Sequence, residues 1–168
     1  MRHRARAIAA AALAAACMAC NGAAKDQPIA FNHDLHVAKG GLPCETCHEH
    51  ASDRAHAGLP PIGVCMDCHK RVTPQNPSGA AQVESMRTLA REGGELVWVR
   101  VYQLPSHVYF SHQRHTEAGG LECKVCHGEM AKLQAPPSQP IAQTVEMDHC
   151  IACHEARGVT TDCAACHR

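Results

Sequence analysis

Five copies of one short motif are the main chemical feature of the chain. Ten of the 12 cysteines form five Cys-x-x-Cys pairs, and a histidine directly follows every pair. Two thiols at this spacing can bond to the two vinyl groups of one porphyrin, and the next imidazole can then bind the iron. The pattern therefore predicts five covalently bound haem c groups. The cysteines are Cys44, Cys47, Cys65, Cys68, Cys123, Cys126, Cys150, Cys153, Cys163 and Cys166, and the proximal histidines are His48, His69, His127, His154 and His167.

Zinc ribbons and disulfide scaffolds also contain paired cysteines. Zinc does not require a histidine after every pair, and five pairs do not combine evenly into four-ligand sites. A disulfide scaffold explains neither the constant spacing nor the histidines. Haem attachment is the interpretation that accounts for all three residues of each motif.

Each haem iron has a second axial position, and the chain offers more histidines than these positions need. Two clusters, at 31–36 and 110–115, share the pattern Phe-x-His-x-x-His. Histidines three residues apart lie on one side of a helical turn and can reach two neighbouring irons. The expected distal ligands are His33, His36, His112 and His115, with His56 as the fifth, and the alternatives are His50, His107, His149 and Met147.

The two histidine clusters belong to a longer internal repeat. Residues 31–48 align without a gap with residues 110–127, at an offset of 79, and nine of the 18 positions are identical. A further haem motif follows each copy. The sequence therefore predicts a duplicated two-haem unit, with repeat one at 31–69, a connector at 70–95, repeat two at 96–154 and a fifth haem segment at 155–168.

The segments between the motifs predict little regular structure. Apolar residues recur at helical spacing over 80–92, which predicts a connector helix. Apolar residues alternate over 97–101, which predicts a strand that pairs with 108–110 in a small β-hairpin. Only 3% of the residues are aromatic, so few large side chains are available for a core. The expected fold is mainly irregular, with short α-helices and this hairpin, around a core of packed haems.

The first 24 residues have the pattern of an export signal. A basic start is followed by an apolar run over 7–16 and then by small residues. The run is too short to span a bilayer, and no later segment is apolar enough, so no transmembrane span is expected after the signal is removed. Attachment of a lipid to Cys17 or Cys20, as in lipoproteins, is an alternative form of this signal. The expected location is the periplasm or cell envelope, with residues 25–168 forming the mature domain.

The charge balance excludes one class of partner. Basic and acidic residues both number 16, which does not fit a strongly basic nucleic-acid-binding protein. The expected partners are redox proteins, which an exported haem protein meets outside the cytoplasm.

The Phe-x-His-x-x-His clusters and the motifs that follow them resemble class III multihaem c-type cytochromes over residues 29–168. The segments 57–61 and 96–112 are similar to the pentahaem subunits of membrane-associated quinol-oxidising complexes, which favours His56 as a ligand. The resemblance implies that His33 ligates the haem at Cys44 and His112 the haem at Cys123, while His36 and His115 reach other haems. It also implies a membrane quinol-oxidising or molybdopterin oxidoreductase complex as partner.

Electron transfer is the function that this ligand supply favours. Two axial histidines close the iron to substrate and give it a low potential. The predicted protein is therefore an electron carrier or electron-transfer subunit and not an enzyme. The alternative is a multihaem reductase, which needs one iron with an open position.

Overall fold

The computed structural model describes residues 26–142 and 145–168. The predicted export signal, with Cys17 and Cys20, lies outside the described residues. The elements are short and all helical. In chain order they are η2 (Asp34–Ala38), η3 (Cys44–Thr46), α2 (Ile62–His69), α3 (Pro77–Arg91), η4 (Arg114–Ala118), α4 (Cys123–His127), η5 (Met130–Lys132), α5 (Met147–Ala156) and α6 (Cys163–Cys166).

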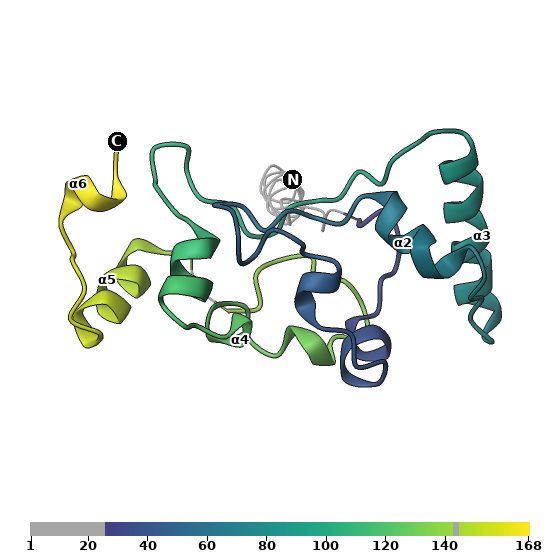
Figure 1. Cartoon of the computed structure of the whole chain (residues 1–168), viewed down its shortest axis with the longest axis horizontal. Coiled ribbons are helices and arrows are strands. Elements are labelled where there is room, and N and C mark those ends of the chain that lie inside the picture. The colour runs from purple at the N-terminus through teal and green to yellow at the C-terminus, as the bar shows by residue number, and fades with distance from the viewer. Residues whose placement is uncertain (1–25, 143–144) are drawn as a thin grey trace, which may run out of the picture.

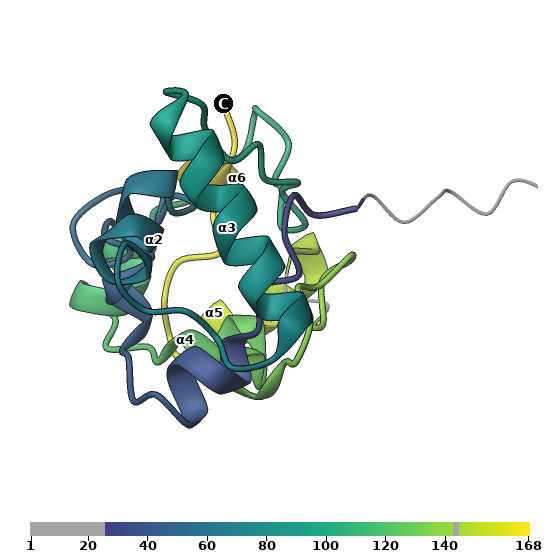
Figure 2. The same ribbon diagram turned by 90° about the vertical axis from the view of Figure 1, so that its right-hand side faces the viewer.

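The described chain forms an elongated molecule (Figure 1). Helices α2 and α3 lie at one end, α5 and α6 lie at the other, and the short turns and α4 lie between them. Viewed from the α3 end, α3 crosses in front of the rest of the molecule (Figure 2). No helix within the described ranges combines the length and hydropathy that a bilayer span needs.

The predicted connector helix is confirmed as α3, which begins three residues earlier than expected. Asn76 caps it, because its side-chain oxygen accepts a hydrogen bond from the Gly79 N–H at 2.7 Å. Pro77 follows at the first helical position, where the missing N–H costs nothing. The turn-rich residues that precede the apolar pattern thus form the start of the helix.

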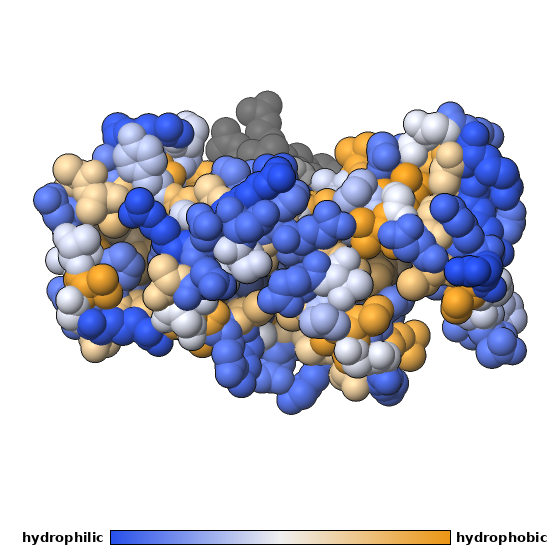
Figure 3. Space-filling view, viewed as in Figure 1, coloured by the Kyte–Doolittle hydropathy of each residue, from blue (hydrophilic) through white to orange (hydrophobic). Residues whose placement is uncertain are grey.

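The side-chain core is very small. Ile62 and Met66 of α2 pack against Val83 and Met86 of α3, and these four residues are the buried apolar cluster of the described chain. Large apolar side chains remain exposed elsewhere, and Val97 is 83% exposed. Polar and apolar residues accordingly alternate over the visible face (Figure 3). So few buried residues cannot hold a domain of this length together without another source of stability.

The predicted β-hairpin is wrong. The described residues contain no strand, and Val108 pairs with His167 in an isolated antiparallel bridge. The Val99 N–H donates to the Gln27 side chain at 3.1 Å, and the Val99 carbonyl accepts from the same amide at 2.9 Å. Other segments therefore take the backbone groups that a hairpin would have paired.

Each histidine cluster forms a backbone hydrogen bond to the other half of the predicted repeat. The Asp34 N–H donates to the Leu133 carbonyl, and the Gln113 N–H donates to the Arg54 carbonyl, both at 3.0 Å. Asp34 and Gln113 are 79 residues apart, and so are Arg54 and Leu133. Each histidine cluster thus contacts the segment that follows the other copy's first motif. The two hydrogen bonds are therefore equivalent in the numbering of the predicted repeat.

Candidate functional site

All five Cys-x-x-Cys-His motifs lie on or beside a helical turn. They are numbered here in chain order as sites 1 to 5. Site 1 begins with η3, site 2 ends α2, site 3 is α4, site 4 lies in α5 and site 5 begins with α6. A helical turn places two cysteines three residues apart on one side of the backbone, as attachment to a single porphyrin requires.

Three of the predicted distal histidines lie close to predicted proximal histidines. A metal–imidazole bond is about 2 Å long. With roughly 1 Å from each nitrogen to its ring centre, two imidazoles on one iron have centres about 6 Å apart. The ring centres are separated by 6.0 Å for His36 and His69, 6.3 Å for His112 and His127, and 6.2 Å for His115 and His154. These separations match one iron between each pair.

The predicted distal histidine that lies near site 1 is His33. Burial is the first cause that lowers the pKa of His33, and the nearby imidazoles of His48 and His36 lower it further. His48 is the proximal histidine of site 1, and His36 faces site 2. The first histidine cluster therefore lies between sites 1 and 2.

At site 5 the structure brings together His167 and His107, which the sequence offered only as an alternative ligand. Their ring centres are 5.6 Å apart, and the Arg168 N–H donates to the His107 carbonyl at 3.0 Å. His56 instead lies near His112, whose pKa it lowers after burial, while the hydrogen bond to Ala55 opposes the shift. The structure thus places His107, and not His56, beside the fifth motif.

The remaining alternatives have other surroundings. The His50 ring lies 3.2 Å from a carboxylate oxygen of Asp53. Met147 and His149 are exposed in the first turn of α5. Among the ring contacts of the described residues, neither His50 nor His149 lies against a motif histidine.

Hydrogen bonds orient most of the paired imidazoles. In each case Nδ1 points to a backbone carbonyl, which leaves Nε2 available for a metal and strengthens the ring as a ligand. The bonds run from His36 to Asn32 (2.8 Å), His48 to Gly58 (3.0 Å), His69 to Val72 (2.9 Å), His112 to Ala55 (3.0 Å), His115 to Ser111 (2.8 Å) and His154 to Thr160 (2.8 Å).

Phe31 and Phe110 hold both histidines of their clusters, a role that the sequence did not reveal beyond the repetition of the residue. Phe31 stacks on His36 with ring centres 4.5 Å apart and meets His33 edge-on at 4.8 Å. Phe110 repeats both contacts, with His115 at 4.5 Å and His112 at 4.9 Å. Each phenylalanine therefore packs against both predicted distal ligands of its cluster.

The thiols of the five sites lie in a row. For five of these thiols, burial is the first cause that raises the pKa, and a thiol of a neighbouring site is the second; they are Cys44, Cys47, Cys65, Cys126 and Cys150. This proximity gives the spatial order 2–1–3–4–5, with site 2 at the α3 end and site 5 at the C-terminal end (Figure 1). The neighbours are Cys65 and Cys68 with Cys47, Cys44 with Cys123, Cys126 with Cys153, and Cys150 with Cys166.

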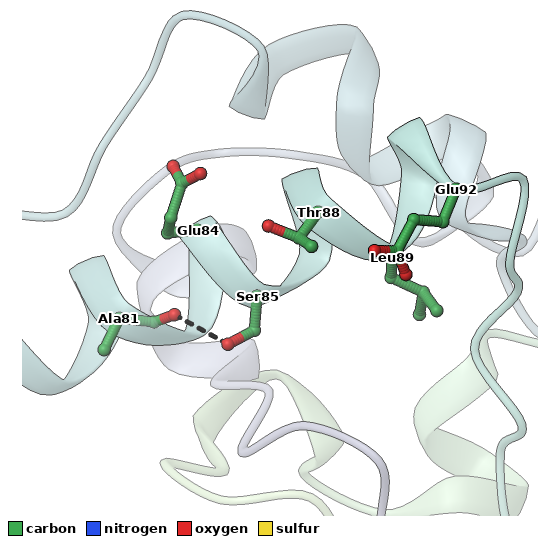
Figure 4. A pocket seen from close by; sticks show the side chains of 6 residues that line it. All are labelled: Ala81, Glu84, Ser85, Thr88, Leu89 and Glu92. Atoms are coloured by element: carbon green, nitrogen blue, oxygen red, sulfur yellow. Dashed lines mark hydrogen bonds between the residues drawn. The ribbon is translucent and has the colours of Figure 1, made fainter.

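Two surface hollows differ in their relation to these sites. One, of about 420 Å³, includes Cys44 and Cys123 in its lining and lies where sites 1 and 3 meet. The other follows one side of α3, where Glu84, Thr88 and Glu92 line it without any cysteine or histidine (Figure 4). Only the first belongs to the motifs.

The donor set fits haem better than zinc. No group of three or more His, Cys, Asp or Glu side chains is gathered as a metal site in residues 26–142 and 145–168. A structural zinc needs four such donors together. The chain instead offers imidazoles in facing pairs beside paired thiols, which suits an iron porphyrin.

The sequence is similar to known haem proteins. Residues 108–168 match the family model described as cytochrome c7 and related cytochrome c. The chain is also similar to the multihaem cytochrome c subunit of menaquinone reductase from Nitratidesulfovibrio vulgaris, with 31% identity over 166 residues. That match covers 86% of this chain and 78% of the relative. The chain therefore belongs to the multihaem cytochrome c family, as an electron-transfer protein that binds haem c covalently.

Proposed function

We propose that the protein binds five haem c groups, each between two histidines. The single observation that carries this proposal is the set of imidazole pairs whose ring centres lie near 6 Å apart. The proximal ligands are those of the motifs. The proposed distal ligands are His33 at site 1, His36 at site 2, His112 at site 3, His115 at site 4 and His107, in place of His56, at site 5.

The chain's own residues then set the chemistry of each site. Haem iron, when bound, supplies a one-electron couple between Fe(III) and Fe(II). Two imidazoles per site leave no axial position for substrate, and carbonyls that accept from Nδ1 keep the rings in place. The row of thiols from site 2 to site 5 aligns the sites for transfer along the molecule.

We further propose that this cytochrome works in the periplasm or cell envelope beside a respiratory quinone complex. The relative from Nitratidesulfovibrio vulgaris is a subunit of a menaquinone reductase, and it aligns over 86% of this chain. A membrane quinol-oxidising subunit or a molybdopterin oxidoreductase is accordingly the proposed partner. The predicted export signal at 1–24 is consistent with that location.

Intact mass spectrometry tests the haem count. The processed, matured chain is expected to exceed its polypeptide mass by five haems, and a gain of four or fewer would contradict the motif assignment. Dithionite-reduced protein is expected not to bind carbon monoxide, because each iron has two histidines. Carbon monoxide binding by the folded protein would favour the reductase alternative.

A matched pair of variants tests the fifth distal ligand. His107→Ala is expected to convert one of the five haems to a high-spin, carbon monoxide-binding form, because His167 loses its facing imidazole. His56→Ala is expected to leave every haem low-spin. Electron paramagnetic resonance measures the spin state of both variants. A high-spin haem in His56→Ala but not in His107→Ala would show that His56 is the fifth distal ligand.

A further inference from the structure

The proposed axial imidazoles differ in their hydrogen bonds. At sites 2 and 4, at either side of the inner pair, both histidines bond through Nδ1 to a backbone carbonyl. At site 3, His112 has such a bond to Ala55, and no bond from Nδ1 of His127 to a carbonyl is present among the described residues. At site 1, His48 has such a bond to Gly58, whereas Nδ1 of His33 is buried and has no hydrogen-bond partner among the described residues; only the His33 position combines burial with the lack of a partner. His33 is the one buried side-chain nitrogen or oxygen position of the described chain in this condition.

The duplication supplies an internal comparison for His33. His112 is its equivalent, 79 residues later, and packs in the same way against its own phenylalanine. Both the N–H and Nδ1 of His112 bond to the Ala55 carbonyl, each at 3.0 Å. A difference in hydrogen bonding, and not in packing, therefore separates the two histidines.

The reciprocal bonding explains where the symmetry breaks. The Arg54 and Leu133 carbonyls make equivalent bonds to the other copy. The next residue is Ala55 in one copy and Gln134 in the other, and within the described residues Gln134 makes no bond to His33. Prolines at 136–137 replace the Ala57–Gly58 pair, and they constrain the backbone from residue 135 onward. Gln134 therefore supplies no acceptor to His33, whereas its equivalent Ala55 does so for His112.

A missing hydrogen bond changes how strongly an imidazole donates to iron. A bond from Nδ1–H to a carbonyl makes the ring a more basic ligand, which stabilises Fe(III) and lowers the potential. His33 lacks this bond, and its burial also keeps water from replacing it. On the basis of the proposed five-haem function, we propose that site 1, between His33 and His48, has the highest reduction potential of the four sites in the two repeats.

This difference in reduction potential would determine which haem holds the first electron, which the spatial order of the sites does not. The first electron delivered to sites 1 to 4 comes to rest at site 1, in the interior of the row, and not at site 2 or site 4. A one-electron reductant such as dithionite radical supplies that electron and is itself oxidised.

A redox titration of the matured protein with single ligand replacements tests this inference. A methionine ligand raises the reduction potential of its haem. In each variant one step of the wild-type redox titration should therefore disappear from its original potential, and that step belongs to the haem whose ligand was replaced. His107→Met marks the step of site 5. Among the other four steps, His33→Met is expected to remove the highest, whereas the matched control His112→Met is expected to remove a lower one.

Two further variants keep the test decisive if His33→Met fails to mature. His36→Met and His115→Met are each expected to remove a step below the highest of the four, as His112→Met does. Loss of the highest step in any of these three variants would overturn the inference. Intact mass and the low-spin spectrum of the wild-type protein report separately on haem count and ligation, so failure of the five-haem proposal would be recognised independently.

Discussion

Two glycines control how each histidine cluster ends. After the cluster the chain turns back, and the Leu42 N–H donates to the His36 carbonyl while the Leu121 N–H donates to the His115 carbonyl, both at 3.1 Å. A Cβ on Gly40 would lie 2.5 Å from the His36 carbonyl oxygen. Both copies of the repeat have Gly-Gly-Leu at this turn because the backbone there passes close to the carbonyl of a predicted haem ligand.

Gly40→Ala is expected to destabilise the protein by about 1–3 kcal/mol, because the new methyl group must displace backbone and not a flexible side chain. The shift moves His36, so one haem is expected to gain high-spin character. Urea unfolding followed by circular dichroism, together with electron paramagnetic resonance, measures both effects.

Gly63→Ala is the matched control for that substitution. Gly63 lies in α2 with open space around its Cβ position, and its φ is not positive. Alanine in a helix is favoured over glycine by about 1 kcal/mol, so this variant should be as stable as the wild type or more so. Equal stability of the two variants would contradict the proposed close contact.

At the scale of elements, α3 closes the end of the molecule at site 2. Its buried residues pack against α2, and Arg87 forms a hydrogen bond to the last residue of α2. The Arg87 side chain is 20% exposed and donates to the His69 carbonyl at 2.7 Å and to the Thr73 hydroxyl at 2.9 Å. A cation at this position also interacts favourably with the C-terminal carbonyls of α2.

Arg87→Met is expected to lower the free energy of unfolding by about 1–3 kcal/mol, because charged hydrogen bonds to partly buried groups are lost. Arg91→Met is the control, since Arg91 is 64% exposed and bonds only to Glu84 and Thr88 of its own helix among the described contacts. Its effect should stay within about 0.5 kcal/mol. Equivalent losses in the two variants would show that Arg87 does not join the helices.

At the scale of the whole molecule, covalent cofactors must replace the missing core. The four-residue cluster of α2 and α3 is far from the other end of the chain, where α5 and α6 contain no buried residue. Folding is therefore expected to depend on haem attachment and iron ligation, as it depends on metal in small zinc domains.

The chain produced without haem maturation is expected to be unfolded. Its circular dichroism should lack helical signal and show no cooperative thermal transition, whereas the matured protein should show both. A cooperative transition in the haem-free chain would mean that side-chain packing alone is sufficient.

Local spacing was enough to predict the covalent chemistry and the connector helix. Attachment of one porphyrin needs only residues within five consecutive positions, and helix α3 needs only its own apolar period and cap. The hairpin prediction failed because the alternation of apolar and polar residues over 97–101 does not determine which segment pairs with that backbone. Gln27 and His167 supply those bonds from far away in the sequence.

The amino-acid sequence by itself thus determined that the protein is a multihaem cytochrome, because each motif is chemically complete where it stands. Only the tertiary structure decided that His107 faces His167, that the sites follow the order 2–1–3–4–5, and that His33 differs from His112. Each of these depends on where loops separated by tens of residues meet, and no local spacing encodes such a meeting.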